Sequence, residues 1–320
     1  MKKIIVLLAL VLSILIYQAY ADSEDGGYAG AFLQAPILAR PAGMGGAFLA
    51  IPNDAAAQLY NPAGMSTTQK RIFSSSYRIM KLDRKLGFVT LAIPTKLQSA
   101  IAVSWLYAGY GEVAARDKNG WESGTTISSS EHDFGLTFAK QFTPFLNIGT
   151  KLNFYYKKVS TLKANSVGIN LGALVTLDSM LTYGSMERKP LTDINFGLVL
   201  NHLSAKYPWA AQGEQLTATQ DDKFPMSIGL GASCRAFKRN LLLAADFEKN
   251  EKQSAVARFG GEYTIDKKFL LRSGLNNGAL TAGAGFRFVH PKTSFGVDCA
   301  WQADRADEGS DFVVSLQFMF

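Results

Sequence analysis

The last ten residues of the chain alternate strictly between two faces of an extended strand. Phe312, Val314, Leu316, Phe318 and Phe320 occupy every second position, so one face of the strand is wholly apolar. In a water-soluble sheet such a face would lie against a core, and a turn would follow the strand. Here the polypeptide ends on an aromatic residue. Whether the apolar face contacts a protein core or lipid therefore has to be decided from the rest of the sequence.

The first 21 residues have the features of an export signal. Lys2 and Lys3 precede an apolar run over 4–16, and Ala19-Tyr20-Ala21 supplies the small residues that a signal peptidase accepts. The run is shorter than the roughly 20 residues that a helix needs to span a bilayer, and a retained anchor is the alternative interpretation. No later stretch is apolar for long enough, so we expect an exported chain without a transmembrane helix.

From residue 71 onward the alternation is nearly continuous. The strand at 146–157 is the clearest in the middle of the chain, since Leu152 and Phe154 alternate with Lys151 and Asn153. The predicted strands are 71–80, 86–93, 99–110, 131–142, 146–157, 165–177, 191–203, 226–237, 241–249, 254–265, 269–275, 279–289, 293–302 and 311–320. Most are close to the roughly 9–11 residues with which a tilted strand crosses a bilayer.

Closure of this sheet follows from the physics of hydrocarbon. An unpaired backbone group there costs several kcal/mol, so the first strand must pair with the last. The predicted connections 111–130 and 204–225 are long and lie on one side, whereas most returns on the other side are short, 178–190 excepted. The sequence therefore predicts an all-β fold, a transmembrane antiparallel up-and-down barrel of about 14 strands, with a soluble β-sandwich as the alternative.

Residues 22–70 precede the barrel strands, and the stretch 28–66 does not alternate. Pro41, Pro52 and Pro62 and many small residues break any long helix or strand. A phosphate-binding loop at 43–46 is an alternative, but no strand clearly precedes it and no Lys-Ser/Thr follows. The composition predicts a compact segment that can pack inside something narrow.

Within this segment, Arg40-Pro41-Ala42-Gly43-Met44-Gly45-Gly46-Ala47-Phe48 is followed by Asn53-Asp54-Ala55 and Asn61-Pro62-Ala63-Gly64. This pattern resembles the N-terminal signature of the PorV/PorQ family, itself similar to FadL-type outer-membrane transporters of hydrophobic compounds. The resemblance implies a hatch over 22–70 that plugs the lumen, and a location in the outer membrane of a diderm bacterium. The hatch motif would consist of Arg40, Gly43, Gly45, Gly46, Asn61, Pro62, Ala63 and Gly64.

The aromatic end of the chain is similar to that of outer-membrane barrels in general. This similarity implies that Phe312, Leu316, Phe318 and Phe320 form the signal read by the barrel-assembly machinery.

The predicted lumen carries almost balanced charge. Its basic residues are Lys151, Arg235, Arg258, Arg272 and Arg287, and its acidic residues are Asp246, Glu248, Glu262 and Asp298. The near balance favours a self-paired network that braces the wall and the hatch. Alternatively, one of the five basic residues holds the carboxylate of an amphipathic ligand.

Tyr207 and Trp209 lie in the long connection 204–225. We expect them to be exposed at the extracellular mouth and to make first contact with a hydrophobic ligand or a partner protein. The alternatives are an anchor at the membrane interface or a fold back over the mouth.

Two functions follow from these features. One is a FadL-like channel for uptake or export of hydrophobic or amphipathic, fatty-acid-like small molecules, with 43–46 as the compliant part of the hatch and 61–64 as its stiff turn. The other is a PorV-like component that binds or shuttles secreted proteins in a type IX-like secretion system. Outer-membrane lipid is an expected partner of both.

Other classes of function find no support in the sequence. The histidines are scattered, and His202 with Ser204 is the only nearby pair that could serve a hydrolase, so we do not expect an enzyme. No metal-ligand spacing is present, and we expect no cofactor. The net charge of +7 is not gathered into basic clusters with stacking aromatic residues, which argues against nucleic acid as a partner.

Overall fold

The computed structural model describes residues 28–177, 191–209, 221–290, 292–303 and 309–320. The predicted signal peptide, the long return 178–190 and the middle of the connection 204–225 lie outside the described residues.

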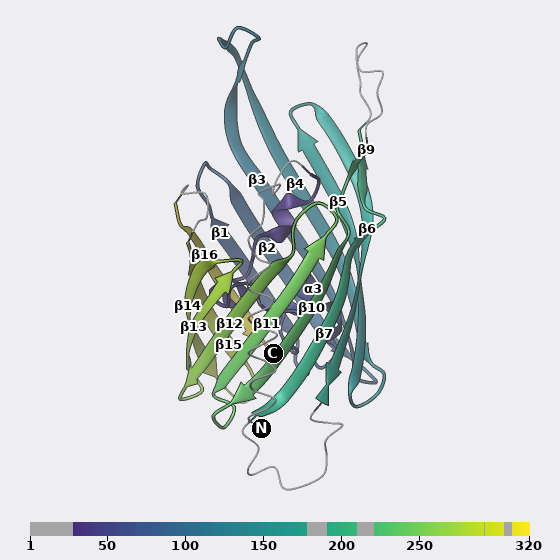
Figure 1. The fold of residues 1–320 in the computed structure, drawn as a ribbon, viewed down its shortest axis with the longest axis vertical. Helices are drawn as coiled ribbons and strands as arrows, with labels where there is room; N and C mark the ends of the chain where they lie inside the picture. The colour runs from purple at the N-terminus through teal and green to yellow at the C-terminus, as the bar shows by residue number, and fades with distance from the viewer. Residues whose placement is uncertain (1–27, 178–190, 210–220, 291, 304–308) are drawn as a thin grey trace.

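Fourteen antiparallel strands close into a barrel, which confirms the predicted fold class and strand number (Figure 1). The strands are β1 (Ile72–Ile79), β2 (Lys85–Thr95), β3 (Ser99–Arg116), β4 (Glu122–Gln141), β5 (Leu146–Val159), β6 (Leu162–Thr176), β7 (Leu191–Leu203), β10 (Ser227–Ala236), β11 (Leu241–Asn250), β12 (Val256–Ile265), β13 (Phe269–Asn276), β14 (Ala279–Val289), β15 (Ser294–Gln302) and β16 (Asp311–Met319). The last strand pairs with the first and places Phe318 opposite Phe73, so the sheet has no free edge within the membrane.

The outer surface of the barrel is apolar. Along β16, Phe312 and Leu316 are 54% and 44% exposed, whereas Val313 and Ser315 between them are 1% and 4% exposed. Large apolar side chains are exposed in this way on nearly every barrel strand. A continuous apolar exterior of this kind belongs in lipid, so the barrel spans a membrane. None of the described helices is long and apolar enough to cross one.

The hairpin formed by β3 and β4 rises beyond the barrel rim (Figure 1). Neighbouring β2 pairs with β3 only as far as Gly109, and β5 pairs with β4 only from Ser129. The prediction of a loop at 111–130 is therefore wrong. Above the rim, β3 and β4 form hydrogen bonds to each other and are surrounded by water. This part of the hairpin therefore needs no apolar face, and its sequence, rich in serine and threonine, shows no apolar alternation.

A short ribbon interrupts the other predicted loop, 204–225. Strand β8 (Lys206–Pro208) pairs with β9 (Asp221–Lys223), and β7 pairs directly with β10 on the barrel wall. The described ends of this connection are thus a hairpin and not irregular chain.

The described part of the predicted hatch, which we call the hatch from here on, lies inside the barrel. It contains four short elements, namely η1 (Ala31–Gln34), α2 (Ala39–Gly43), α3 (Ala57–Tyr60) and η2 (Pro62–Met65). Most residues from 36 to 66 are buried, and α2 packs against β13 to β16 while η2 packs against β3 to β6. The prolines limit each element to one turn or little more, which allows the segment to coil within the lumen.

Candidate functional site

Glycines allow the hatch to approach the barrel wall closely. A Cβ atom added to Gly43 would lie 3.0 Å from the Cα of Gly283, and one added to Gly283 would lie 3.1 Å from the Cα of Gly43. Gly45 has a φ of +65°, and its Cβ would come within 2.6 Å of the carbonyl oxygens of Phe259 and Leu275. Only glycine fits at position 45.

Short polar side chains on the wall bind the hatch backbone. Asp246 accepts hydrogen bonds from the amides of Phe48 (2.5 Å) and Leu49 (2.9 Å). Thr281 accepts from the Gly45 amide at 2.9 Å. The alternation of β11 predicts Asp246 among the lumen charges but does not predict this role. A short polar residue at an inward position, in a wall rich in glycine, is the signal that could have indicated it.

Asn61 explains the Asn-Pro-Ala-Gly motif. Its Oδ1 accepts a hydrogen bond from the Ala63 amide and caps η2, with Pro62 at the first helical position. Its Nδ2 donates to the carbonyl of Leu49 in the hatch (2.9 Å) and to that of Ala173 on β6 (3.0 Å). The motif therefore forms a rigid turn that is fastened to the wall.

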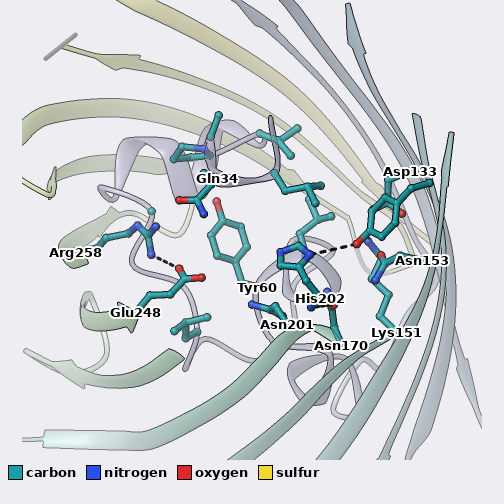
Figure 2. Close-up of a pocket in the computed structure, with 18 residues that line it drawn as sticks. Gln34, Tyr60, Asp133, Lys151, Asn153, Asn170, Asn201, His202, Glu248 and Arg258 are labelled. Carbon is teal, nitrogen blue, oxygen red and sulfur yellow. Dashed lines mark hydrogen bonds and ion pairs between the residues drawn. The ribbon is translucent and has the colours of Figure 1, made fainter. Parts of the chain in front are cut away.

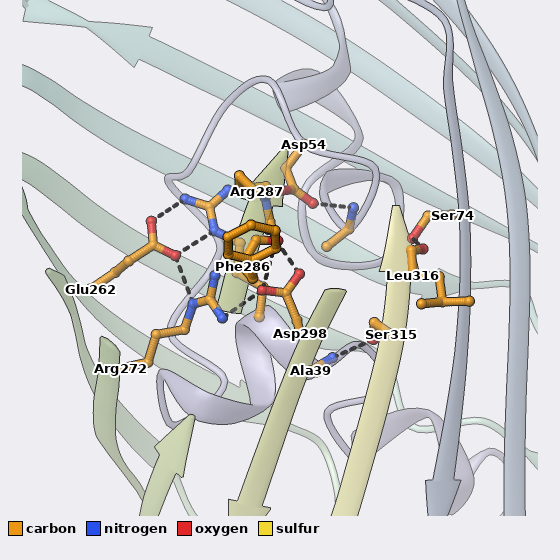
Figure 3. A network of polar contacts seen from close by, with 12 residues as sticks. Ala39, Asp54, Ser74, Glu262, Arg272, Phe286, Arg287, Asp298, Ser315 and Leu316 are labelled. Carbon is orange, nitrogen blue, oxygen red and sulfur yellow. Dashed lines mark hydrogen bonds and ion pairs between the residues drawn. The ribbon is translucent and has the colours of Figure 1, made fainter. Parts of the chain in front are cut away.

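A buried network, which we call the latch, connects the hatch with β12, β13 and β15 (Figure 3). Arg40 binds Glu262 through two hydrogen bonds (2.9 and 2.7 Å) and Asp54 at 2.7 Å. Glu262 also accepts from Arg272 (2.7 Å), which in turn binds Asp298 at 2.8 Å. Burial alone would lower the pKa of the Arg40 guanidinium, but the two carboxylates raise it above its ordinary value. Arg40 therefore stays charged.

All five basic residues predicted for the lumen form ion pairs. The pairs are Lys151 with Asp133 (2.9 Å), Arg235 with Asp193 (3.5 Å), Arg258 with Glu248 (2.7 Å), Arg272 with Glu262 (2.7 Å) and Arg287 with Asp298 (2.8 Å). This is the self-paired arrangement that the near balance of charge favoured. A side chain already bound to a carboxylate offers little to the carboxylate of a ligand.

A cavity of about 70 Å³, which we call the inner cavity, lies between the hatch and the wall (Figure 2). Its sides are mostly polar. Asp133, Lys151 and Asn153 lie on one side, and Glu248 and Arg258 lie on the other. Its remaining lining comprises Leu33, Gln34, Ala35, Pro36, Ile37, Gly46, Leu49, Leu59, Tyr60, Tyr155, Asn170, Asn201 and His202.

A bulge in β7 turns two consecutive side chains toward this cavity. Leu200 pairs with Leu171 and Leu203 pairs with Ile169, so Asn201 and His202 together face the single residue between those partners. That residue, Asn170, accepts a hydrogen bond from the His202 amide at 2.9 Å. Successive side chains of a regular strand point to opposite faces, but the bulge directs the side chains of both Asn201 and His202 toward the same cavity.

His202 and Ser204 do not form a pair. The His202 ring lies 3.4 Å from the Tyr155 hydroxyl and stacks on Phe224, whereas Ser204 is exposed. Within the described part of the chain, no hydrogen bond joins His202 to Ser204.

An aromatic cluster covers the outer side of the inner cavity, and we call it the cap. Tyr207 is fully buried, and its ring packs against Phe224 at 4.9 Å, while Phe224 stacks on Tyr155 at 4.5 Å. Trp209 is half-buried and packs against Tyr207. The expected exposure of Tyr207 is therefore wrong. The ribbon packs against β6, with the Lys206 amide donating to the Ser166 hydroxyl at 2.8 Å, because burial of its aromatic rings is favourable.

A larger cavity of about 400 Å³, the outer cavity, lies near the turns on the same side as the β3–β4 hairpin. Its lining includes Arg78, Lys81, Arg84 and Asp311. The two cavities share Arg258 and hatch residues 34–36. This short stretch of hatch is the common wall between them.

No protein-family model matches the chain, and no curated protein matches it in sequence. Solved structures do match. The CymD monoaromatic hydrocarbon channel is 14% identical with a TM-score of 0.61, over 88% of this chain and 97% of that one. The Pseudomonas putida toluene transporter TodX is 11% identical with a TM-score of 0.60, over 87% of this chain and 96% of that one. The chain shares the barrel fold of these two proteins.

Proposed function

We propose that the protein is a hatch-gated channel in the outer membrane of a diderm bacterium, through which small hydrophobic or amphipathic molecules are taken up or exported. The observation that carries this proposal is a pair of cavities, inside a lipid-facing barrel, whose linings share hatch residues 34–36 and Arg258. The fold is that of channels for monoaromatic hydrocarbons, which supports a small, largely apolar cargo.

The moving part would be η1 and the residues that follow it. Among the described residues, no wall side chain forms a hydrogen bond to 31–35, whereas the wall binds the hatch at Pro36, Ile37, Ala39 and many later positions. The stretch 43–46, expected to be compliant, is buried and bonded to Thr281. A shift of η1 would join the two cavities and leave the latch in place.

Thiol labelling at Ala35 tests this route. Ala35 lines both cavities, whereas Ala31 is exposed and lines only the outer one. Single-cysteine variants Ala35→Cys and Ala31→Cys would be made after Cys234 and Cys299, both unpaired, are replaced by serine. A bulky maleimide on Ala35→Cys should abolish uptake of labelled toluene and octanoate by expressing cells, and the Ala31→Cys control should retain most of it. Normal uptake by a fully labelled Ala35→Cys protein would disprove the route.

The β3–β4 hairpin favours a second candidate, a PorV-like role in binding secreted proteins. Among the described residues, no strand pairs with the outer edge of β3 beyond Gly109 or with that of β4 before Ser129, and Trp121 near the tip is 75% exposed. Free strand edges are sites where a partner polypeptide can add a strand. Deletion of 113–127 should abolish co-purification of exported proteins in the producing organism and leave toluene uptake intact. Unchanged co-purification would exclude the hairpin from this role.

A further inference from the structure

The inner cavity contains buried polar atoms without hydrogen-bond partners. Both side-chain atoms of Asn153 are unpaired, and so are Oδ1 of Asp133 and Oδ1 of Asn201. Asn153 and Asp133 are each 1% exposed and lie on one side of the cavity, whereas Asn201 is 9% exposed and lies between them and Glu248, with its Nδ2 donating to Ser227 (Figure 2). A buried polar atom without a partner is unfavourable, so this wall is complementary to a molecule that supplies the missing bonds.

The charges of the cavity exclude one class of partner. Lys151 is bound to Asp133 and Arg258 is bound to Glu248, so each cation in the lining is neutralised by an adjacent carboxylate. A ligand carboxylate would find no free cation, and it would lie near two acidic side chains. Asp133 and Glu248 are in turn bound to these cations, so a cationic head would find no free carboxylate either, and we infer a neutral head.

The unpaired atoms also determine the hydrogen-bonding character of that head. Of these four atoms, three are oxygens that accept and the fourth, the Asn153 amide nitrogen, is a donor. A hydroxyl fits this set, since it donates to one oxygen and can accept from the amide. Leu33, Ile37 and Leu59 on the hatch offer an apolar surface to the rest of the molecule.

We propose that the inner cavity selects small amphipathic molecules with a neutral hydroxyl group, alcohols or phenols, over hydrocarbons and carboxylates. This inference rests on the proposed channel function and names its substrate class. The Asn153 amide would donate to the hydroxyl oxygen, and the hydroxyl would donate its single proton to Oδ1 of Asp133. Pure hydrocarbons would leave all of these atoms unpaired, and that is the physical basis of the discrimination.

Toluene, phenol and benzoate test this proposal, because they share one ring and differ in a methyl, a hydroxyl and a carboxylate group. Their affinities for the purified full-length protein in detergent can be measured by isothermal titration calorimetry. Phenol should bind at least about tenfold more tightly than toluene or benzoate. Equal or tighter binding of toluene, or tightest binding of benzoate, would overturn the proposal.

The Asn153→Leu variant tests whether the preference for phenol arises in the inner cavity. The substitution should weaken phenol binding about tenfold and leave toluene binding unchanged, since only the polar contacts are lost. Asn165→Leu is the matched control, because Asn165 is exposed on β6 and should change neither affinity. Phenol binding that is unaffected by Asn153→Leu would also overturn the proposal.

The two proposals fail in different experiments. If labelled Ala35→Cys loses uptake but phenol is not preferred, the channel stands and the substrate class is wrong. If phenol is preferred at Asn153 but labelling does not affect uptake, the cavity binds hydroxyl compounds and the proposed route through 34–36 is wrong.

Discussion

Arg40 and Glu262 lie 222 positions apart in the sequence and meet in a bidentate pair inside the barrel, Nε to Oε2 at 2.9 Å and Nη2 to Oε1 at 2.7 Å. The parallel geometry of a guanidinium and a carboxylate makes this one of the stronger polar contacts in proteins. It also connects the hatch with the strand network around Arg272 and Asp298. The pair therefore fastens the plug while η1 remains less constrained.

Replacement of Arg40 by methionine should loosen the hatch. The variant leaves Asp54 without its ion-pair partner and Glu262 with Arg272 alone, so we expect a loss of about 3 kcal/mol in the free energy of unfolding. Urea unfolding in detergent measures it. The control is Arg116→Met, whose exposed pair with Glu122 should contribute less than about 1 kcal/mol. Equal losses in the two variants would show that the latch does not hold the hatch.

Gly45→Ala should displace the hatch from β12 and β13. The added methyl group would meet the carbonyl oxygens of Phe259 and Leu275, and the backbone at Gly45 is left-handed. Gly120→Ala controls for backbone strain, because Gly120 has a φ of +85° and open space around it. Thermal unfolding should therefore occur at a clearly lower temperature in Gly45→Ala than in Gly120→Ala. Similar shifts would mean that strain alone, and not contact with the wall, explains the glycine.

The cap should detach at alkaline pH. Burial raises the pKa of the Tyr207 phenol, and Glu131, with Oε2 at 3.4 Å, raises it further. The stability contributed by the neutral phenol is fully present below about pH 10, the pKa of an unfolded tyrosine. This stability is lost as the pH rises further, because the Tyr207 phenol ionises at a lower pH in the detached cap than in the attached one. Fluorescence of Trp209, with Trp105, Trp121 and Trp301 replaced by phenylalanine, should report the change.

The control for this titration is Tyr207→Phe, which should remain attached over the same range. Lys157 lies over the Tyr207 ring, with Nζ 5.6 Å from its centroid, and it stays in place in the variant. A transition that persists in Tyr207→Phe would show that ionisation of Tyr207 does not detach the cap.

Phe320→Ala should reduce the amount of barrel assembled in the membrane. Phe320 is 42% exposed at the end of the closing strand, where its backbone bonds to Arg71 in both directions at 3.0 Å. Phe295→Ala removes a similarly exposed ring (40%) near the start of the neighbouring strand β15. Heat-modifiability on gels measures the folded fraction. If the two variants assemble equally well, the terminal phenylalanine carries no special signal.

Local patterns explain what could be predicted. The alternation from Phe312 to Phe320 predicts a lipid-facing strand, because side-chain direction in a strand depends only on position along the chain. The small residues around Gly45 and the prolines of the hatch predict a segment that packs tightly in a narrow space. The hairpin above Gly109 was missed, because two strands that bond to each other in water need no apolar face. Tyr207 is buried and not exposed as predicted, since composition does not indicate against which surface a ribbon packs.

By itself, the sequence determined the strands, their number and the need for closure, since these follow from periodicity and from the cost of unpaired backbone in lipid. Only the tertiary structure decided that Arg40 meets Glu262, that Asn201 and His202 share one cavity, and which carboxylate each of the five predicted lumen cations binds. Contacts across a barrel depend on the stagger of every strand and on bulges. A shift of one residue turns each side chain to the opposite face, so periodicity alone cannot identify the partners.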